Sequence, residues 1–431
     1  MNTERRSCGA RIPGRFPGSA FGLALVAAVA GTGVACGVSP PPGSETLFTD
    51  SPGVAIAESS TFPEEGAGGW SLDPTPSLSI GTLDGGSIYQ CFQVTGSLRL
   101  PDGRLAISDL GTRQLRIYSA DGTYQTSFGR EGEGPGEFRD IRVMGTVGSD
   151  TLVVLDGALR RVSRIHPEAG FLGVANFPEE AGITRHFNGM FSDGSIVFGG
   201  GVNWNRGEAD EVLQGYERLT NPFVSVALDG EGITHFGEFP GTEVVWTMGN
   251  YGGRESVAAG FPHFGKSPRA MARGNQLVLG TRDRYEVLVF DPLGEMVRIV
   301  RVDAPPVPVT QAHLEALLEQ RLSRLPDSDL APRVREGFWT QPRSDYLPAF
   351  EALLIDSEGC IWVEDYLQPG AHSRTWTIFS TEGRPLTRLS LPVANRVFDI
   401  GEDYILASFQ DELDVEYVRM YLLKRGAMRP D

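Results

Sequence analysis

Histidine and cysteine are scarce in this sequence, and their scarcity limits the chemistry that the chain can perform. Among 431 residues there are four cysteines and six histidines, the latter at positions 166, 186, 235, 263, 313 and 372. No two histidines have the spacing of metal ligands, and none stands beside Cys91 or Cys360. The Gly-x-Ser-x-Gly motif of serine hydrolases is absent as well. The usual catalytic constellations are therefore poorly represented.

A membrane-spanning run is also missing near the N-terminus, where residues 21–30 read FGLALVAAVA. That run is too short to cross a bilayer as a permanent helix. Arginines precede it and the small residues GTGVAC follow it, so residues 1–35 are predicted to be an export signal. GVAC resembles the bacterial lipobox, in which the cysteine, here Cys36, becomes the lipidated first residue. Gly33 stands where that motif usually has leucine, and ordinary cleavage after residue 30 is the alternative.

The segment after Cys36 favours a lipid anchor. Residues 37–45, GVSPPPGSE, form a Pro/Gly/Ser tether between the cysteine and the rest of the chain. Gly37 is not the aspartate that retains lipoproteins at the inner membrane, so we expect an outer-membrane lipoprotein, with a periplasmic or extracellular protein as the alternative. Export would permit a disulfide between Cys91 and Cys360, but both stand in apolar strand-like runs and are predicted to be separate buried thiols.

Positive charge is in short supply. The formal net charge is −17, and the predicted signal holds four arginines, so the exported part is more acidic still. Such a surface repels nucleic acid and anionic lipid headgroups. We expect a monomer that has no nucleic-acid partner and that contacts the membrane through its lipid anchor.

Glycine and proline, in contrast, are abundant, with 54 and 29 residues, and this density of turn formers indicates many short strands. Six segments share the form of a turn followed by an alternating apolar strand. Where nothing is inserted they recur about every 45 residues, which is the period of a four-stranded propeller blade. The segments are PDGRLAISD from Pro101, GSDTLVVLD from Gly148, SDGSIVFGG from Ser192, RGNQLVLGT from Arg273, SEGCIWVED from Ser357 and GEDYILASF from Gly401.

The glycine-rich stretch FGREGEGPGEFRDI, residues 128–141, lies between two such segments. A glycine-rich loop that binds phosphate must open a helix, whereas the residues that follow here are typical of short strands. We therefore interpret the stretch as punctuation of the repeat. The sixth copy stops short of a fourth strand, and PSLSIG at 76–81 is a strand without a blade of its own. Pairing the two would close the ring and remove both sheet edges.

FGREGEGPGEF following DGRLAISDLGTRQLRIYSADG resembles the NHL-type repeat, and the exported chain resembles the bacterial six-bladed β-propeller lipoproteins. TDSPGVAIAES, before the first repeat, resembles the short strand that precedes the propeller in such proteins. The resemblance implies an all-β fold with six four-stranded blades over residues 70–431, closed by the N-terminal strand, with residues 36–69 as tether and pre-propeller segment. The resemblance predicts the fold far better than it predicts the function.

Three long connections interrupt the repeats, at 200–221, 239–267 and 306–348, and the strand order places all three on one face of the disk. Such excursions are uncommon unless they have a task. In the third, between blades four and five, five leucines (314, 317, 318, 322 and 325) share one face of a predicted helix with Thr310 as N-cap. The insertions could also bury aromatic residues in a small core of their own. Candidate ligand or partner contacts on them are Trp204, Arg206, Trp246, Tyr251, Arg254, His263, Phe338, Trp339 and Tyr346.

The central channel is the second candidate site, because the first strand of each blade lines it. Three arginines and a histidine around one axis would attract an anion in an otherwise acidic protein. A register shift by one residue would turn these side chains away, and an Arg–Glu ring that holds the blades together is the alternative. Near the strand starts stand Thr95, Arg142, His186, Asn188, Arg269, Glu351 and Arg396.

These observations favour a binding or scaffold module that recognises an envelope protein, peptide or glycan through its inserted face, without a cofactor. The alternative is a hydrolase or lyase with a metal-assisted site at the channel mouth, where a divalent cation would need ligands such as Glu351 and Asn188.

Asp109 and Asp156 end their strands just before Arg113 and Arg160. We interpret those carboxylates as turn contacts and not as acid–base partners, so no catalytic residue is predicted.

The lipobox interpretation predicts that Cys36→Ala leaves an uncleaved or soluble protein, because the acyl group is attached through the cysteine sulfur. Metabolic labelling with a radioactive fatty acid checks this: wild type should incorporate label and the variant should not. Equal labelling of the two proteins would contradict lipidation at Cys36.

Overall fold

A computed structural model describes residues 46–178, 186–202, 215–251, 254–323, 325, 330–369, 373–391 and 396–426. The predicted export signal, Cys36 and the tether lie outside these residues, as do Trp204 and Arg206. Gly43–Asp431 form one compact unit. Within the described part of the chain, no helix is long and apolar enough to cross a membrane.

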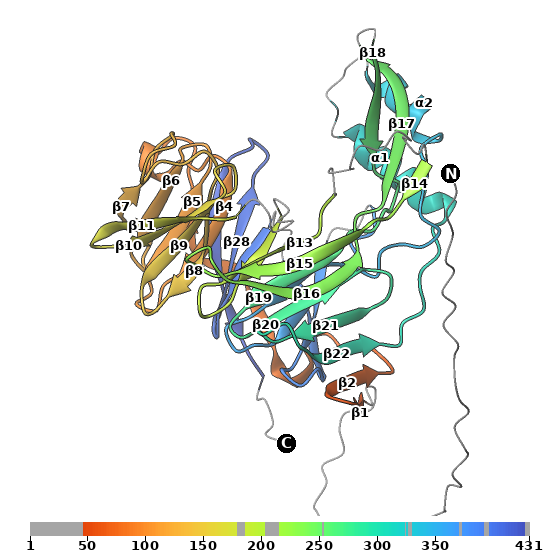
Figure 1. Ribbon diagram of the computed structural model, residues 1–431, viewed down its shortest axis with the longest axis horizontal. Coiled ribbons are helices and arrows are strands. Elements are labelled where there is room, and N and C mark those ends of the chain that lie inside the picture. Colours follow the sequence, from red (N-terminus) through yellow and green to blue (C-terminus); the bar gives the residue numbers. More distant parts are fainter. Residues whose placement is uncertain are drawn as a thin grey trace, which may run out of the picture. The chain divides into compact units, whose positions relative to one another are not determined.

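The fold is an all-β propeller (Figure 1). Four blades are separate four-stranded antiparallel sheets, and three of them use strands that are consecutive in the chain. The fourth combines three C-terminal strands with one N-terminal strand. The blades are β4 (Val94–Arg99), β5 (Leu105–Asp109), β6 (Gln114–Tyr118) and β7 (Tyr124–Phe128); β8 (Ile141–Val147), β9 (Thr151–Asp156), β10 (Arg161–His166) and β11 (Gly170–Asn176); β23 (Phe350–Ile355), β24 (Ile361–Asp365), β25 (Arg374–Phe379) and β26 (Pro385–Leu391); β27 (Arg396–Ile400), β28 (Tyr404–Gln410), β29 (Glu416–Lys424) and β3 (Ser71–Ile80).

The remaining propeller strands form one ten-stranded sheet with two halves. A single parallel bridge, Gly189 to Ala272, joins the halves, and a Cβ at Gly189 would meet the Ala272 carbonyl oxygen at 2.2 Å. The N-terminal hairpin adds to the second half through the parallel pair β2–β22 (Figure 1). The strands are β12 (Phe187–Met190), β13 (Ile196–Gly199), β15 (Thr220–Val226) and β16 (Ile233–Pro240), then β19 (Arg269–Arg273), β20 (Gln276–Gly280), β21 (Glu286–Phe290) and β22 (Met296–Val302), with β1 (Thr46–Ser51) and β2 (Val54–Ser59).

Each of the six repeated sequence segments forms the second strand of a sheet, counted from the channel: β5, β9, β13, β20, β24 and β28. These strands are buried on both faces because neighbouring sheets pack against each other. In β5, for example, Ala106 packs with Leu152 of the next blade, and Leu105 packs with Leu406 of the C-terminal blade. All four side chains are buried. Near-continuous apolar runs in the repeat are therefore explained by burial on two sides.

Asp109 and Asp156 do hold turns, but their partners differ from the expected arginines. The Asp109 carboxylate accepts hydrogen bonds from the backbone N–H groups of Phe92 (2.7 Å) and Thr112 (3.0 Å). Asp156 accepts hydrogen bonds from the backbone N–H of Arg139 (2.8 Å) and from two further backbone N–H groups. Both carboxylates are fully buried. Each one ties the end of the second strand to the chain entering the first, because backbone N–H groups in these loops would otherwise lack acceptors.

The N-terminal strand closes the last sheet, as the sequence predicts. β3 pairs antiparallel with β29, from Ile80 opposite Val418 to Ser71 opposite Lys424. β3 contains two prolines, which an outer strand can accommodate because one of its edges needs no donors. The prediction of separate thiols is also confirmed: Cys91 and Cys360 are buried and free, and burial raises the pKa of each to about 12.

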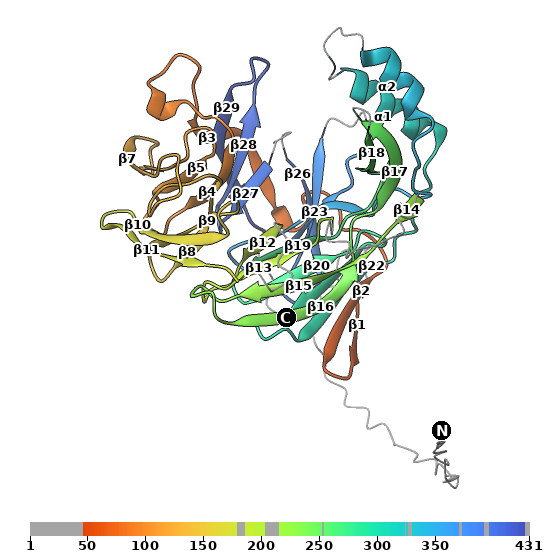
Figure 2. The same cartoon turned by 45° about the horizontal axis from the view of Figure 1, so that its top comes forward.

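The three insertions come together in a second layer, which we call the insertion lobe. It consists of the three-stranded sheet β14 (Gly215–Glu217), β17 (Val244–Tyr251) and β18 (Arg254–Gly260), together with α1 (Gln311–Ser323) and α2 (Leu330–Phe338). Figure 2 shows these elements gathered to one side of the propeller strands. The expected N-cap is present, since the His313 N–H donates to the Thr310 hydroxyl oxygen (3.3 Å). Leu325 lies beyond the end of α1, and the sequence did not predict α2.

If β3 closes the ring, two N-terminal truncations should behave differently. A chain beginning at residue 60 loses only the β1–β2 hairpin, whereas a chain beginning at residue 82 also loses β3 and leaves β29 with an unpaired edge. We expect the first to remain monomeric with a modest loss in melting temperature, and the second to aggregate. Light scattering and thermal melts measure this, and equal behaviour of the two truncations would rule out a closing role for β3.

Candidate functional site

The first strands of the sheets surround a cavity of about 620 Å³. It is lined from β4, β8, β12, β19, β23 and β27, so it is the central channel expected for a propeller. Of the residues placed at the channel mouth from sequence, His186 alone is outside the lining. Thr95, Arg142, Asn188, Arg269, Glu351 and Arg396 all line the cavity.

His186 precedes β12 and lies against Gly201, where an added Cβ would approach the imidazole ring to 2.0 Å. Burial lowers the pKa of His186, and the positive charge of Arg269 lowers it further. The imidazole is therefore held neutral near physiological pH. It could accept or donate a hydrogen bond at the edge of the channel, but it adds no positive charge.

The charge of the channel wall opposes that of the whole protein. Six arginines and three carboxylates line a cavity in a chain whose net charge is −17. A concave site with an excess of one sign of charge concentrates the field and favours ligands of the opposite sign. The lining charges are Arg99, Arg142, Arg269, Arg273, Arg374 and Arg396, with Glu351, Glu364 and Asp399.

A hydrogen-bonded network spans the end of the channel at which the first strands finish. Arg273 of β19 donates to the carboxylate of Asp399 on β27 (2.8 Å) and to the carbonyl of Ile355 on β23 (3.2 Å). Asp399 also accepts from the Tyr404 hydroxyl (2.6 Å) and from the backbone N–H of Arg99 (3.2 Å). Burial and the Asp399 charge raise the pKa of Tyr404, so its hydroxyl remains a donor. Five strands, β4, β19, β23, β27 and β28, are cross-linked at this end.

Carboxylates neutralise two arginines on the wall formed by β19, β23 and the neighbouring β25. Glu351 lies 3.5 Å from Arg269 and 2.7 Å from Arg282, which is buried and holds a positive φ of 69°. Glu364 binds Arg374 at 2.7 Å. Burial raises the pKa of Glu364 although Arg374 opposes the rise. This part of the wall matches the Arg–Glu ring that the sequence left as an alternative.

The other wall presents arginines without such partners. Among the described residues, Arg142 and Arg396 form no ion pair, and each guanidinium instead lies over an aromatic ring. Arg142 is 4.2 Å from the centroid of Phe187, and Arg396 is 5.5 Å from that of Phe398. Burial lowers the pKa of Arg142 to about 10, and the charge of Arg396 contributes to this. Neither aromatic residue was predicted from the sequence, although Phe187 follows His186 directly and Phe398 lies two residues after Arg396.

The insertion lobe buries three of the aromatic and imidazole side chains expected on its surface. Trp246 is 7% exposed and donates from its indole N–H to Glu217 (2.8 Å). His263 stacks on Phe338 with ring centroids 4.0 Å apart, and both are 2% exposed. Phe338 belongs to a small core of the lobe with Phe264, Leu314, Leu318 and Leu347, as in the alternative considered from the sequence. Trp246, His263 and Phe338 are not available as surface contacts.

Two expected contacts on the lobe are exposed: Trp339 at 48% and Tyr346 at 45%. Tyr251 and Arg254 face each other across the end of the β17–β18 hairpin, where the structure describes the backbone alone. Of the described candidate side chains, Trp339 and Tyr346 are exposed on the third insertion, whereas Trp204, Arg206, Tyr251 and Arg254 stay predictions.

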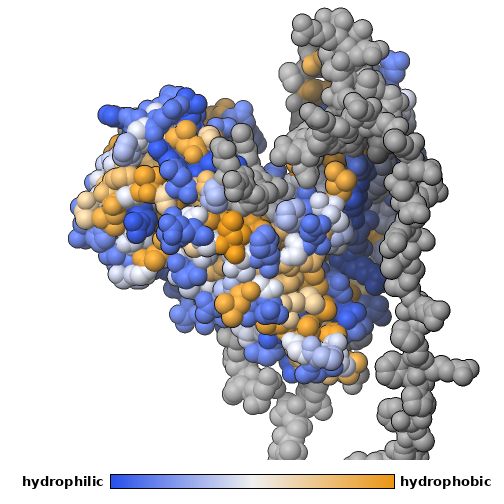
Figure 3. Space-filling model, in the orientation of Figure 1, coloured by the Kyte–Doolittle hydropathy of each residue, from blue (hydrophilic) through white to orange (hydrophobic). Residues whose placement is uncertain are grey.

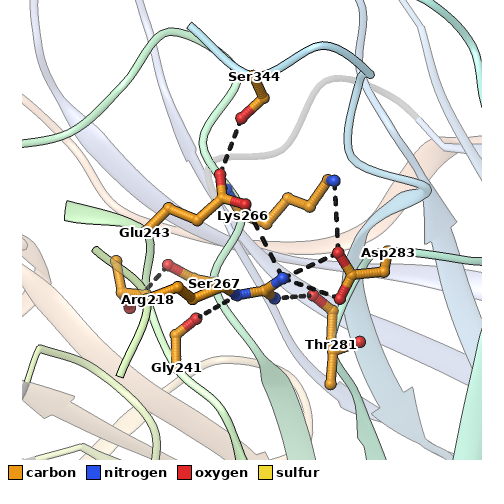
Figure 4. A network of polar contacts seen from close by, with 9 residues as sticks. Arg218, Gly241, Glu243, Lys266, Ser267, Thr281, Asp283 and Ser344 are labelled. Atoms are coloured by element: carbon orange, nitrogen blue, oxygen red, sulfur yellow. Dashed lines mark hydrogen bonds and ion pairs between the residues drawn. The ribbon is translucent and has the colours of Figure 1, made fainter. Parts of the chain in front are cut away.

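A polar network joins the lobe to the propeller (Figure 4). Arg218, after β14, donates from Nη1 to both carboxylate oxygens of Asp283 (2.8 and 2.9 Å). The buried Glu243 accepts from the Lys266 backbone N–H (2.9 Å) and the Ser344 hydroxyl (2.8 Å), while Lys266 Nζ lies 3.3 Å from Asp283. Two cations meet two carboxylates, so the network is neutral. The network therefore links the three insertions to one another and to the propeller turn that contains Asp283.

The glycine-rich stretch of residues 128–141 wraps around a side chain and not around an anion. The Arg161 guanidinium donates to the carbonyl oxygens of Glu133 (2.6 Å), Gly134 (2.9 Å) and Glu137 (2.6 Å). Carbonyl oxygens turned inward would repel phosphate, and strand β8 follows where a phosphate loop would open a helix. Its role as punctuation of the repeat is supported. In the same described residues, no group of three or more His, Cys, Asp or Glu side chains could hold a metal ion.

No protein-family model matches the sequence, and no curated protein sequence is similar to it. Several solved structures are similar in fold. One is a member of the duf4221 family from Bacteroides vulgatus, with 12% identity over 83% of this chain and 99% of that chain and a TM-score of 0.47. Another is virginiamycin B lyase from Staphylococcus aureus (11% identity, 81% and 99% coverage, TM-score 0.36). A third is the calcium-binding protein regucalcin from Agrobacterium tumefaciens (10% identity, 79% and 94% coverage, TM-score 0.35). Likenesses of this degree carry no statement about the site.

Burial separates two tryptophans that the sequence treated alike. Trp246→Ala should destabilise the lobe by about 3–5 kcal/mol, because it removes a buried ring and its hydrogen bond. Trp339→Ala should change stability by less than about 0.5 kcal/mol, since its ring is half exposed. Denaturant unfolding followed by near-ultraviolet circular dichroism measures both. Similar losses for the two variants would mean that Trp339 belongs to the lobe core.

Proposed function

We propose that the chain is an exported, lipid-anchored propeller that binds a small ligand in its central channel. The observation that carries the proposal is the cavity of about 620 Å³, whose wall is arginine-rich in a protein of net charge −17. Pockets of this size accommodate drug-sized or metabolite-sized molecules. Export and the Cys36 anchor rest on the sequence of the first 36 residues.

In this proposal the ring has six blades, and the protein is an NHL-like propeller lipoprotein of the bacterial type. Two features support that count. The two halves of the ten-stranded sheet share one backbone bridge, which is what neighbouring blades rather than one continuous sheet would leave. Each half contains one of the six repeated segments and contributes its first strand, β12 or β19, to the channel.

In this proposal the ligand enters from the end of the channel at which the first strands begin. The opposite end is spanned by the Arg273–Asp399–Tyr404 network. The insertion lobe reaches the entry end through Arg282, which binds Glu351 and lies 5.8 Å from the ring of Tyr366, a residue packed against the lobe core. The lobe would therefore border the entrance and help to select ligands, with Trp339 and Tyr346 available to a larger envelope partner.

Narrowing the channel tests this function. Met271 of β19 lines the cavity, so Met271→Trp should fill part of it. Leu293→Trp is the control, because Leu293 lies on a surface turn and is 80% exposed. Each protein is incubated with the small-molecule filtrate of an envelope extract and examined by native mass spectrometry. Wild type and Leu293→Trp should carry a common adduct that Met271→Trp lacks, because only the latter loses cavity volume.

Melting curves of the three proteins provide the folding control for that experiment. An adduct retained unchanged by Met271→Trp would mean that the channel is not the binding site. Loss of the adduct from both tryptophan variants, with intact melting curves, would contradict the proposal as well.

A further inference from the structure

The unpaired arginines of the channel define the chemistry of its ligand more closely than the cavity does. Arg142 stands on β8 and Arg396 on β27, and β4, whose Thr95 also lines the cavity, lies between these strands around the ring. In the described part of the chain, the other wall arginines have a carboxylate: Arg99 has Asp403 (3.2 Å), while Asp399, Glu351 and Glu364 serve Arg273, Arg269 and Arg374. The two arginines thus form one cationic patch, which we call the arginine pair.

The arginine pair is held in an arrangement that is unfavourable without a counter-charge. Arg142 is half-buried and Arg396 is exposed on the cavity wall, and their like charges repel each other. Desolvating the half-buried Arg142 guanidinium costs free energy that a carboxylate in contact normally offsets. Asp140 attracts Arg142 only from beyond ion-pair distance, and no described carboxylate lies within 4.0 Å of either guanidinium. The aromatic rings of Phe187 and Phe398 support the guanidinium planes but supply no full negative charge. A bound anion would relieve both the repulsion and the missing partner.

We propose that the arginine pair binds the phosphate group of a phosphomonoester, a proposal that rests on the proposed function because it needs a ligand in the channel. A phosphomonoester carries close to two negative charges at neutral pH and three terminal oxygens, so it matches two guanidiniums in charge and in acceptor number. A carboxylate offers one charge and two oxygens, which suit a single guanidinium.

The rest of the ligand would lie against the remaining wall, where the charges are already paired. Glu351 is shared by Arg269 and the buried Arg282 there, and Glu364 pairs with Arg374. Trp376 also lines the cavity. A second strongly charged group would therefore gain little at this wall. The ligand class is a small molecule with one phosphate and an uncharged, partly apolar body.

Two probes that share a ring and differ in the anion test the proposal: phenyl phosphate and benzoate, measured by isothermal titration calorimetry. Wild type should bind phenyl phosphate more tightly than benzoate by about tenfold or more. Arg142→Gln and Arg396→Gln should each weaken phenyl phosphate binding by about ten- to a hundredfold, as expected when a charged hydrogen-bond donor is lost. Arg130→Gln is the matched control, because that side chain is 79% exposed outside the cavity.

The pH profile supplies a second readout. The affinity for phenyl phosphate should rise as the pH passes the second pKa of the phosphate, about 6, because the probe then gains its second charge. Above that pH the affinity should stay constant through the neutral range, because the guanidiniums of both arginines remain charged. In the unliganded protein, Arg142→Gln should raise the melting temperature, because it removes the repulsion.

Several results would overturn the assignment. Equal affinity for benzoate and phenyl phosphate would leave an anion site but refute its preference for phosphate. Unchanged phosphate binding in Arg142→Gln and Arg396→Gln would place the anion elsewhere. If phenyl phosphate fails to bind while the envelope adduct is still lost in Met271→Trp, the channel function stands and the arginine pair is not a phosphate site.

Discussion

The pairing of β3 with β29 is the contact on which the rest of the structure depends. It joins a strand near residue 75 to one near residue 420, and it completes the sheet that would otherwise end the ring. Ile80 of β3 packs with Leu105 and Ile107 of the first sheet and with Leu406 and Val418 of the last. Because the first and last blades share this cluster, the first strands are held around one axis. The central cavity exists only while that ring is closed.

Closure also concentrates charge. Side chains at the starts of strands in different blades are brought into one enclosed space, where their charges interact more strongly than on the surface. The chain uses this in two ways. Glu351 pairs with Arg269 across two blades, and Glu364 pairs with Arg374 within one blade, whereas Arg142 and Arg396 form no ion pair among the described residues. Strain of this kind is typical of binding sites, where stability is lost so that a ligand can restore it.

Much of the propeller could be predicted because its information is local and repeated. A turn followed by an apolar strand recurs six times, and a strand buried on both faces leaves a continuous apolar run that is easy to recognise. The closing strand could be found by accounting for a missing and a surplus strand. The channel residues followed from strand starts, and Thr95, Arg142, Asn188, Arg269, Glu351 and Arg396 do line the cavity.

The insertions were predicted less well because nothing in them repeats. Trp246 and Trp339 look alike in sequence, yet one is buried under a hydrogen bond to Glu217 and the other is half exposed. Contacts between distant segments decide this, and the last residue of α2, Phe338, stacks on His263 of the second insertion. The αL conformation of Arg282 and its contact with Glu351 leave no local signal either, since non-glycine residues adopt that conformation when tertiary contacts require it.

The central claim is that a doubly charged oxyanion occupies the channel between Arg142 and Arg396. An anomalous difference map from crystals soaked in selenate tests it most directly, because selenate is a tetrahedral dianion whose selenium can be located without reference to the protein model. The account predicts a single strong peak inside the cavity within hydrogen-bonding distance of both guanidinium groups. A cavity without selenium, in crystals whose surface arginines do bind it, would contradict the account.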